Sequence, residues 1–312
     1  MQITKERVKN WHACTDGFRW FLDKFPQGGA YADVHGALVA DKRFDDARWL
    51  VDKMYSTFLD NPEFIKTETA ATDKMVGELT SMEFSGDQVD GENNSGDSAQ
   101  IGSSGDSAQI GSSGDSAQIG SSGDSAQIGS SGDSAQIGSS GYYARIGSSG
   151  YYAQIGSSGD YARIGSSGDS ARIGSSGDSA QIGSSGYYAR IGSSGDSAQI
   201  GSSGDSAQIG SSGYYARIGS SGDSAQIGSS GDYARIGSSG DSARITASGK
   251  NSVVACAGSV HRIVLGEGGC AVVPWHDGER TRFAVAYVGE NGIEANVPYC
   301  LNDEGQFVRV EE

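Results

Sequence analysis

The residues best suited to chemistry lie in a nine-residue unit, Gly-Asp-Ser-Ala-Gln-Ile-Gly-Ser-Ser, which occurs seventeen times in the stretch 96–245. Calcium-binding nonapeptides have the form Gly-Gly-x-Gly-x-Asp-x-apolar-x, and the aspartate is a ligand. When Gly102 and Gly105 are aligned with the motif's glycines, Ser107 stands where the aspartate is needed and Asp106 stands one place early. We therefore expect no calcium site in the repeats.

The other candidates for metal binding or catalysis also lack the spacing that their chemistry requires. Structural zinc sites use closely spaced pairs of ligands, and no such pairing is found among Cys256, His261, Cys270, His276 and Cys300. The repeat serines have no histidine or lysine in any unit to activate them as nucleophiles. The chain has no nucleotide-binding glycine loop either. The sequence predicts a protein that is not an enzyme and holds no metal or cofactor.

Only three positions of the unit vary. Position two is Asp or Tyr, position three is Ser or Tyr, and position five is Gln or Arg. Tyrosine stands at position three in six units, and five of these also carry arginine at position five. This pairing favours Tyr–Arg stacking through cation–π contacts, and duplication drift alone does not explain it. We expect these residues to bind a partner: Tyr143, Arg145, Tyr152, Tyr161, Arg163, Tyr188, Arg190, Tyr215, Arg217, Tyr233 and Arg235.

The apolar residues of each unit predict one short β-strand. Ala99 and Ile101 are two residues apart and share one face of a strand, whereas Ser98 and Gln100 point the other way. The Gly-Ser-Ser-Gly segment suits a tight bend, because glycine tolerates a positive φ. Nine residues are too few to enclose a core, so two units form one coil of 18 residues.

The fixed period of the units is typical of repeat architectures. The predicted fold class is mainly β: a two-sided parallel β-solenoid, or β-roll, with a small helical domain before it and a β cap domain after it. A flexible Gly/Ser-rich linker is the alternative. Resistance of the repeat arginines to trypsin would separate the two.

With two units per coil, alternate units share a face of the solenoid. One face then carries two Tyr/Arg patches, around Tyr143 and Tyr161 and around Tyr215 and Tyr233. The two patches are four coils apart, or about 19 Å at the spacing of β-strands. The opposite face carries Tyr152, Arg172, Tyr188 and Arg190. Tyrosine and arginine are enriched at the energetic centres of protein interfaces, so we interpret the patches as contact sites.

Acidic residues dominate the charge of the chain. The 312 residues carry a net charge of −16, and thirteen aspartates lie in the repeats. The first five units form an acidic surface through Asp97, Asp106, Asp115, Asp124 and Asp133. We expect no direct nucleic-acid binding, because counterion release from phosphates requires a basic face.

The sequence divides into three predicted domains, over residues 1–84, 85–248 and 249–312. The first has helical patterns over 5–11, 15–25, 32–40 and 45–59, with a looser extension over 60–84. Residues 84–95 resemble a broken repeat and predict a first coil. The sequence of the last domain predicts strands separated by glycine-rich turns. The first strand can continue the solenoid, and the others can cap it or join it to a second copy.

The compartment is predicted from what the sequence lacks. No run of 18 apolar residues predicts a transmembrane helix, and the first residues do not resemble a signal peptide. Four cysteines form no disulfide framework. We expect a protein of the bacterial cytoplasm.

Two segments resemble parts of known families. The pattern Ala13-Cys14-x-x-Gly17-x-x-Trp20-Phe21-Leu22, followed by Trp49-Leu50, resembles a small helical module of bacterial and phage-encoded proteins. The segment 284–290, with Gly292-Ile293 and Gly305-x-Phe307-Val308, resembles the C-terminal β module of phage and prophage accessory proteins. The resemblance implies an origin in a mobile element and no particular reaction. In principle the rod is also similar to the pentapeptide-repeat solenoids that imitate DNA.

Together these observations favour a rod-shaped interaction protein that binds and inhibits a host macromolecular complex. A mobile-element origin makes DNA-processing or defence machinery, such as a CRISPR effector or a restriction enzyme, the expected target. The Tyr/Arg patches could instead join two copies into a homodimer. An ice- or crystal-binding solenoid and a structural spacer of a virion or filament are the alternatives.

Overall fold

The computed structural model describes residues 1–59, 61–81, 93–94 and 96–310. The chain forms two compact units, Met1–Leu59 and Asp60–Glu312. In the first unit, short strands alternate with helices around a core that includes Phe21, Leu50 and Met54. Its elements are β1 (Gln2–Ile3), α1 (Lys5–Asn10), α2 (Thr15–Lys24), β2 (Gly29–Ala30), α3 (Tyr31–Ala40) and α4 (Phe44–Phe58).

The predicted N-terminal helical region is confirmed, and side chains cap two of its helices. Thr4 accepts a hydrogen bond from the Arg7 amide and caps α1. At α2 the cap is Cys14, whose Sγ accepts from the Gly17 amide at 3.2 Å. Two of the tryptophans pack on each other: the rings of Trp11 and Trp49 meet edge to face at 6.3 Å.

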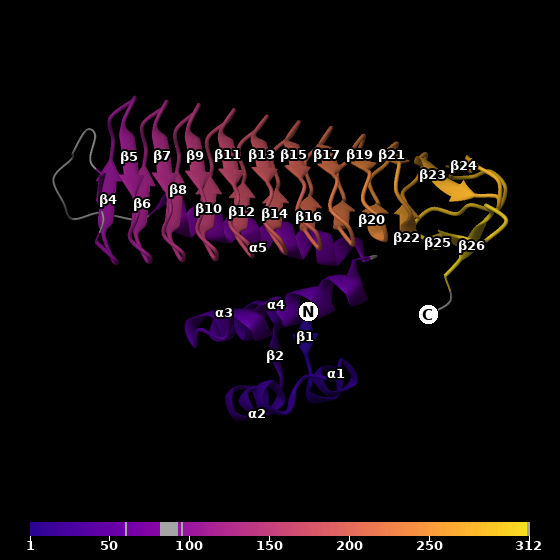
Figure 1. Cartoon of the computed structure of the whole chain (residues 1–312), viewed down its shortest axis with the longest axis horizontal. Coiled ribbons are helices and arrows are strands. Elements are labelled where there is room, and N and C mark those ends of the chain that lie inside the picture. The colour runs from indigo at the N-terminus through magenta and orange to yellow at the C-terminus, as the bar shows by residue number, and fades with distance from the viewer. Residues whose placement is uncertain (60, 82–92, 95, 311–312) are drawn as a thin grey trace. The chain divides into compact units, whose positions relative to one another are not determined.

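The second unit contains the predicted parallel β-solenoid (Figure 1). Each of the first sixteen repeats forms one four-residue strand, and the last forms a five-residue strand. Each of the sixteen four-residue strands pairs in register with the strand 18 residues later, as Gln100 does with Gln118. Alternate strands therefore build two separate sheets of twelve strands each. The predicted coil of 18 residues is confirmed.

We call the first of these the covered sheet, because a helix lies on it. It comprises β4 (Gln100–Ser103), β6 (Gln118–Ser121), β8 (Gln136–Ser139), β10 (Gln154–Ser157), β12 (Arg172–Ser175), β14 (Arg190–Ser193), β16 (Gln208–Ser211), β18 (Gln226–Ser229), β20 (Ala243–Ala247), β22 (Val260–Leu265), β25 (Pro298–Leu301) and β26 (Phe307–Arg309).

We call the other the open sheet. It comprises β3 (Asn93–Asn94), β5 (Gln109–Ser112), β7 (Gln127–Ser130), β9 (Arg145–Ser148), β11 (Arg163–Ser166), β13 (Gln181–Ser184), β15 (Gln199–Ser202), β17 (Arg217–Ser220), β19 (Arg235–Ser238), β21 (Val253–Cys256), β23 (Cys270–His276) and β24 (Thr281–Tyr287). Of the predicted first coil over 84–95, the structure describes Asn93–Asn94, which form β3; residues 84–92 and 95 lie outside the described residues.

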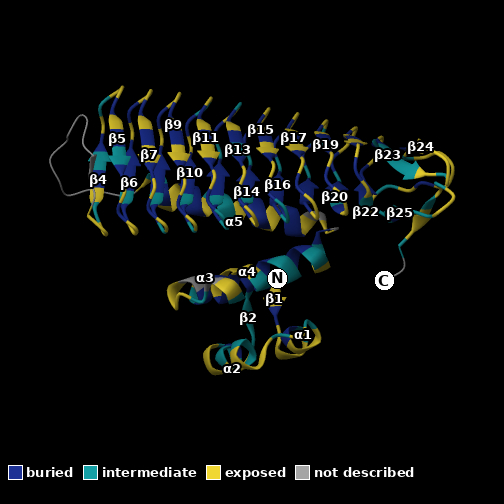
Figure 2. Cartoon of the chain, in the orientation of Figure 1, coloured by how far each residue is buried: buried dark blue, intermediate teal, exposed yellow. Residues whose placement is uncertain are grey.

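The interior of the solenoid is a repeated stack of small and branched side chains. Ala153 and Ile155 are fully buried, as are their equivalents in most coils, and exposed residues alternate with them (Figure 2). Burying one isoleucine contributes about 1.5–3 kcal/mol. The serine at position eight also points inward: Ser157 is fully buried. The expectation that this serine belongs to the corner is therefore wrong, because it is the last residue of the strand.

The corner is the segment from position one to position four, and its glycine has a different role from the one expected. None of the described repeat glycines has a positive φ. Instead, a Cβ placed on Gly114 would lie 1.9 Å from the Gly96 carbonyl oxygen of the neighbouring coil. Position one is therefore glycine because adjacent corners stack closely.

The corners change conformation along the rod. Position three has a left-handed backbone from Tyr161 onward, with φ of 58° at Tyr161, and this residue is Ser or Tyr rather than Gly. The amide of Tyr143 donates to the Asp124 carbonyl of the preceding coil, whereas the amide of Tyr161 donates to the Asp178 carbonyl of the next. The peptide before position three has thus reversed its direction.

The C-terminal residues first extend and then close the solenoid. Strands β21, β22 and β23 continue the parallel ladders, so the solenoid runs past the predicted boundary at 248. Strands β24, β25 and β26 then pair antiparallel at the end of the two sheets. The buried side chains of Ile293 and Tyr299 join the solenoid core here.

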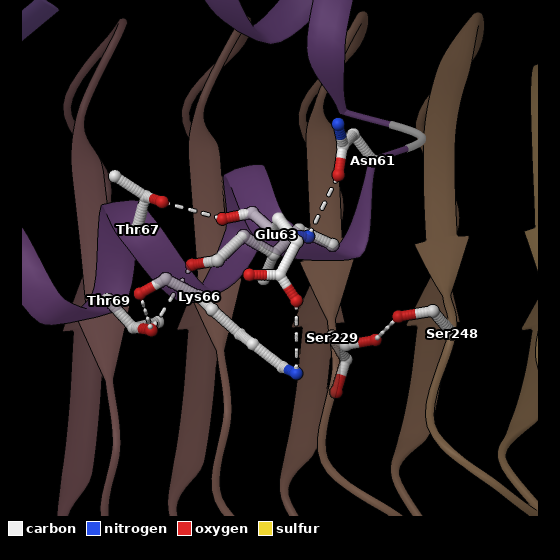
Figure 3. Close-up of polar contacts among 8 residues, drawn as sticks. Asn61, Glu63, Lys66, Thr67, Thr69, Ser229 and Ser248 are labelled. Atoms are coloured by element: carbon white, nitrogen blue, oxygen red, sulfur yellow. Dashed lines mark hydrogen bonds and ion pairs between the residues drawn. The ribbon is translucent and has the colours of Figure 1, made fainter. Parts of the chain in front are cut away.

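Helix α5 (Pro62–Thr80) lies along the outer face of the covered sheet, over strands β8 to β16 (Figure 1). Asn61 caps it by accepting from the Glu63 amide at 2.9 Å, and Thr67 and Thr69 donate to carbonyls one turn back (Figure 3). We expected the helical domain to run to residue 84. The first compact unit ends at Leu59, because α5 packs on the solenoid instead.

Candidate functional site: the open sheet

The outer face of the open sheet is a shallow groove that follows the solenoid axis. One wall is the column of Gln and Arg at position five, and the floor is the column of glycines at position seven. The groove is continuous over eight strands, from Gln109 to Arg235. A Cβ on Gly147, Gly165 or Gly183 would have no atom within 4 Å, so the floor is bare backbone.

Two tyrosine pairs stand at the corners that lead into this sheet. The rings of Tyr143 and Tyr161 stack at 5.6 Å and those of Tyr215 and Tyr233 at 5.2 Å. All four are 44–57 % exposed. The structure therefore brings together, across adjacent coils, the tyrosines that the sequence grouped. Their ring contacts are with other tyrosines, so stacking on arginine stays a prediction.

Four arginines form two adjacent pairs in the wall of the groove. Arg145 pairs in register with Arg163, and Arg217 with Arg235, so like charges are strand neighbours. All four side chains are exposed. Within the described part of the chain, no ion pair is recorded for any of them. Neighbouring like charges on a sheet are destabilising, and an anionic partner would relieve this repulsion.

The opposite face uses the same repeat for an internal contact. Arg190 and Glu68 of α5 form an ion pair at 2.7 Å, with side-chain exposures of 17 % and 6 %. Ser194 donates to Asp73 of α5 at 2.7 Å, and burial raises the pKa of Asp73. We expected Arg190 to contact a partner, and in the structure it holds α5. Tyr152 and Tyr188 lie at the corners that lead into this covered sheet.

The sequence reading missed four further tyrosines and the role of α5. Tyr142, Tyr151, Tyr187 and Tyr214 stand at position two and are 51–55 % exposed. The signal was present, because tyrosine replaces aspartate there in four of the six units that have tyrosine at position three. Tyr142 packs against Tyr143 with centroids 6.4 Å apart and enlarges the first patch.

The aspartates at position two lie on the corners, and many have a structural role. Asp97, Asp106, Asp115, Asp124 and Asp133 are exposed, as expected. After the change of corner conformation, the carboxylate instead accepts from the backbone of the next coil, as Asp160 does from the Asp178 amide at 2.8 Å. The same contact, from Ser259, lowers the pKa of Asp241.

The net charge of the repeats is spread much more thinly than the charge of a nucleic acid. Thirteen aspartates and seven arginines leave a net charge of −6 in the repeats. Spread over about 40 Å of rod, this is about one net charge per 7 Å. Double-stranded DNA has one per about 1.7 Å. The Tyr/Arg groove is therefore a more distinctive surface than the acidic corners.

The helical unit has a second concave feature. A cavity of about 240 Å³ is lined mostly by apolar side chains, among them Trp20, Phe21 and Leu50. Cys14 and Gly17 also line it. The motif that the sequence singled out thus surrounds this cavity.

Metal ligands, thiols and long apolar helices add no further site within the described residues. Among the described residues, no group of three or more His, Cys, Asp or Glu side chains is placed to hold a metal ion. Cys256 is buried, and burial raises the pKa of its thiol to about 12. In the part of the chain that the structure describes, the helices are too short or too polar to cross a bilayer.

Comparison with known proteins finds a family match to the helical unit. Residues 1–59 match the family described as the YdhT N-terminal domain. Over 49 residues the chain is 59 % identical to the uncharacterized protein YdhT of Escherichia coli (strain K12). This match covers 16 % of the chain and 18 % of that relative. No solved structure matches the chain. The matched segment coincides with the first compact unit, Met1–Leu59.

Proposed function

We propose that this protein is a non-enzymatic interaction protein whose open sheet binds another protein. The observation that carries the proposal is that stacked, exposed tyrosines and four exposed arginines lie beside one continuous groove. Within the described residues, these arginines form no recorded ion pair. Tyrosine and arginine supply most of the binding energy at many interfaces. The rigid solenoid holds these side chains in place before binding, which lowers the entropic cost of association.

The finer proposal is that binding inhibits a host complex in the bacterial cytoplasm, as a counter-defence protein of a mobile element. Its support is the resemblance of the terminal segments to phage-encoded modules and the acidic corners, which would repel nucleic acid from a blocked machine. Because the charge density of the repeats is low, we assign imitation of DNA a smaller role in this inhibition than the Tyr/Arg groove.

An ice- or crystal-binding surface is the second candidate. The in-register strands of the open sheet favour it, since equivalent residues of successive coils stand side by side, as Gln181 and Gln199 do. The serine at position eight adds nothing to such a surface, because it points into the core. Thermal hysteresis of a purified sample tests this candidate.

Capture of partners from bacterial lysate tests the proposed function. The bait is the full chain, and the test variant carries serine at Tyr143, Tyr161, Tyr215 and Tyr233. The control is Tyr152→Ser. The sequence placed Tyr152 among the partner-binding residues, but the proposal leaves it out, because its corner leads into β10 of the sheet that α5 covers. We expect a partner that is enriched on the wild type and on the control and lost from the fourfold variant. Equal capture by all three baits would contradict the proposal.

A further inference from the structure

The two sheets present the same repeat outward, but within the described residues a helix covers one of them and not the other. On the covered sheet, the glycines at position seven let α5 approach the backbone closely. A Cβ on Gly138 would lie 2.0 Å from the Leu79 carbonyl oxygen, and one on Gly174 would lie 2.5 Å from Thr72 Cγ2. On the covered sheet, the glycine floor and the Gln/Arg wall therefore form the surface on which α5 packs.

The order of Gln and Arg at position five in the strands beneath α5 recurs on the open sheet. From β8 to β16, position five reads Gln, Gln, Arg, Arg, Gln. From β5 to β13 on the open sheet it again reads Gln, Gln, Arg, Arg, Gln, and from β13 to β19 it reads Gln, Gln, Arg, Arg. The equivalents of Arg190, which holds Glu68, are Arg163 and Arg235.

The serine that anchors α5 also has equivalents. Ser194, which donates to Asp73, corresponds to Ser167 and Ser239 at position nine of the two units on the open sheet. Of the three arginine pairs in the repeats, one is thus already explained by a bound helix. The other two stand in the same register over an empty glycine floor.

We propose that the groove of the open sheet binds an acidic amphipathic helix of a partner protein in the manner of α5. This inference rests on the proposed function and names the chemistry of the partner. Eight strands span about 34 Å, which matches a helix of about 22 residues. The helix presents small or β-branched side chains to the glycines and two sets of carboxylates to the arginine pairs.

The spacing of the arginine pairs restricts the partner further. The pairs are four coils apart, or about 19 Å. On a helix, residues about 11 or 14 positions apart lie on nearly the same face and are roughly 17–21 Å apart. A partner helix should therefore carry its carboxylates at one of these intervals.

The test uses a 22-residue, fluorescein-labelled peptide that carries the sheet-facing residues of α5, including the glutamate equivalent to Glu68. A hydrocarbon staple on its solvent side keeps it helical, since isolated helices of this length are marginal in water. Fluorescence anisotropy with the full chain at low salt measures binding. We expect saturable binding that weakens at least about fivefold when the peptide's glutamates become glutamines.

Three variants of the chain locate the binding. Gly165→Ala fills open space in the free chain and closes the floor, so it should weaken binding about tenfold or more without altering the fold. Arg163→Gln should weaken it about fivefold. Arg244→Gln removes the same charge from β20 of the covered sheet and should leave binding within about twofold of the wild type.

The inference is overturned if the peptide does not bind the wild type, or if Gly165→Ala binds it equally well. It is also overturned if sedimentation shows a dimer that Gly165→Ala dissociates, because the occupant is then a second copy of this chain. Partner capture by the tyrosine variants is independent of the peptide. The proposed function therefore stands or falls separately.

Discussion

The difference between the two glycine floors gives a sharp test of the architecture. Gly174→Ala and Gly165→Ala make the same change at the same position of adjacent repeats, on opposite sheets. At Gly165 the new methyl group enters open space. At Gly174 it would lie 2.5 Å from Thr72 Cγ2 and 2.8 Å from Val76 Cγ2 of α5. Both replacements reduce the freedom of the unfolded chain, which stabilises by about 0.4–1 kcal/mol.

Overpacking of a tight contact costs about 1–3 kcal/mol, so the two variants should differ by about that amount. The difference should appear as detachment of α5, because the helix can move and the parallel ladder cannot. Trypsin cleavage at Lys66 and Lys74 within α5 reports this local opening when opening is fast. A change of 1–3 kcal/mol corresponds to roughly 5- to 150-fold faster cleavage. The cleavage rate of Gly165→Ala should match that of the wild type. Equal cleavage rates in the two variants would refute the packing of α5 on the glycines of the covered sheet.

Three further predictions concern α5, the corners and the interior. Burial raises the pKa of Asp73, so the native state holds the proton more tightly and its contribution to stability falls as the pH rises above about 3.8. Asp73→Asn should raise the urea midpoint at pH 7 and remove this pH dependence; an unchanged midpoint would count against it. Ser197 has φ of 58°, so Ser197→Gly should stabilise by up to about 1 kcal/mol, whereas Ser125→Gly, at a corner without positive φ, should destabilise by about 0.5–1 kcal/mol. The same sign in both denaturant curves would disprove the change of corner conformation. Among the described residues, the buried Ser211 hydroxyl has no hydrogen-bond partner, so Ser211→Ala should raise the free energy of unfolding by about 1 kcal/mol. Ser130→Ala should not raise it, because the Ser130 hydroxyl accepts from the Gly132 amide at 3.4 Å.

The period of the repeats was enough to predict the solenoid, its 18-residue coil and the residues that share a face. These follow from the alternation of a strand, which puts Ala99 and Ile101 on one side. Serine at position eight was misplaced, since a hydroxyl gives no hydrophobic signal of burial. The left-handed corners also escaped prediction, because position three is serine or tyrosine and neither favours that conformation.

The covering of one sheet could not be read from the repeats. Both sheets are built from the same nine residues, so nothing in one unit says which face takes a helix. The deciding residues lie outside the repeats, in α5, where Glu68 and Asp73 reach Arg190 and Ser194 across more than 120 residues of chain. The candidate site was accordingly predicted as two patches on one face with further tyrosines and arginines on the other, and the structure divides these residues between an open sheet and a sheet that α5 covers.

Photo-crosslinking from the groove tests the central claim most directly. One benzoylphenylalanine replaces Gln181, in the wall of the groove on β13 of the open sheet. The control replaces Gln100 on β4 of the covered sheet, beyond the strands that α5 covers. Both positions are outward and exposed. If the open sheet is the binding face, irradiation in cells should link a discrete partner to the chain from Gln181 and not from Gln100. Crosslinks of equal yield from both positions, or from Gln100 alone, would contradict the account.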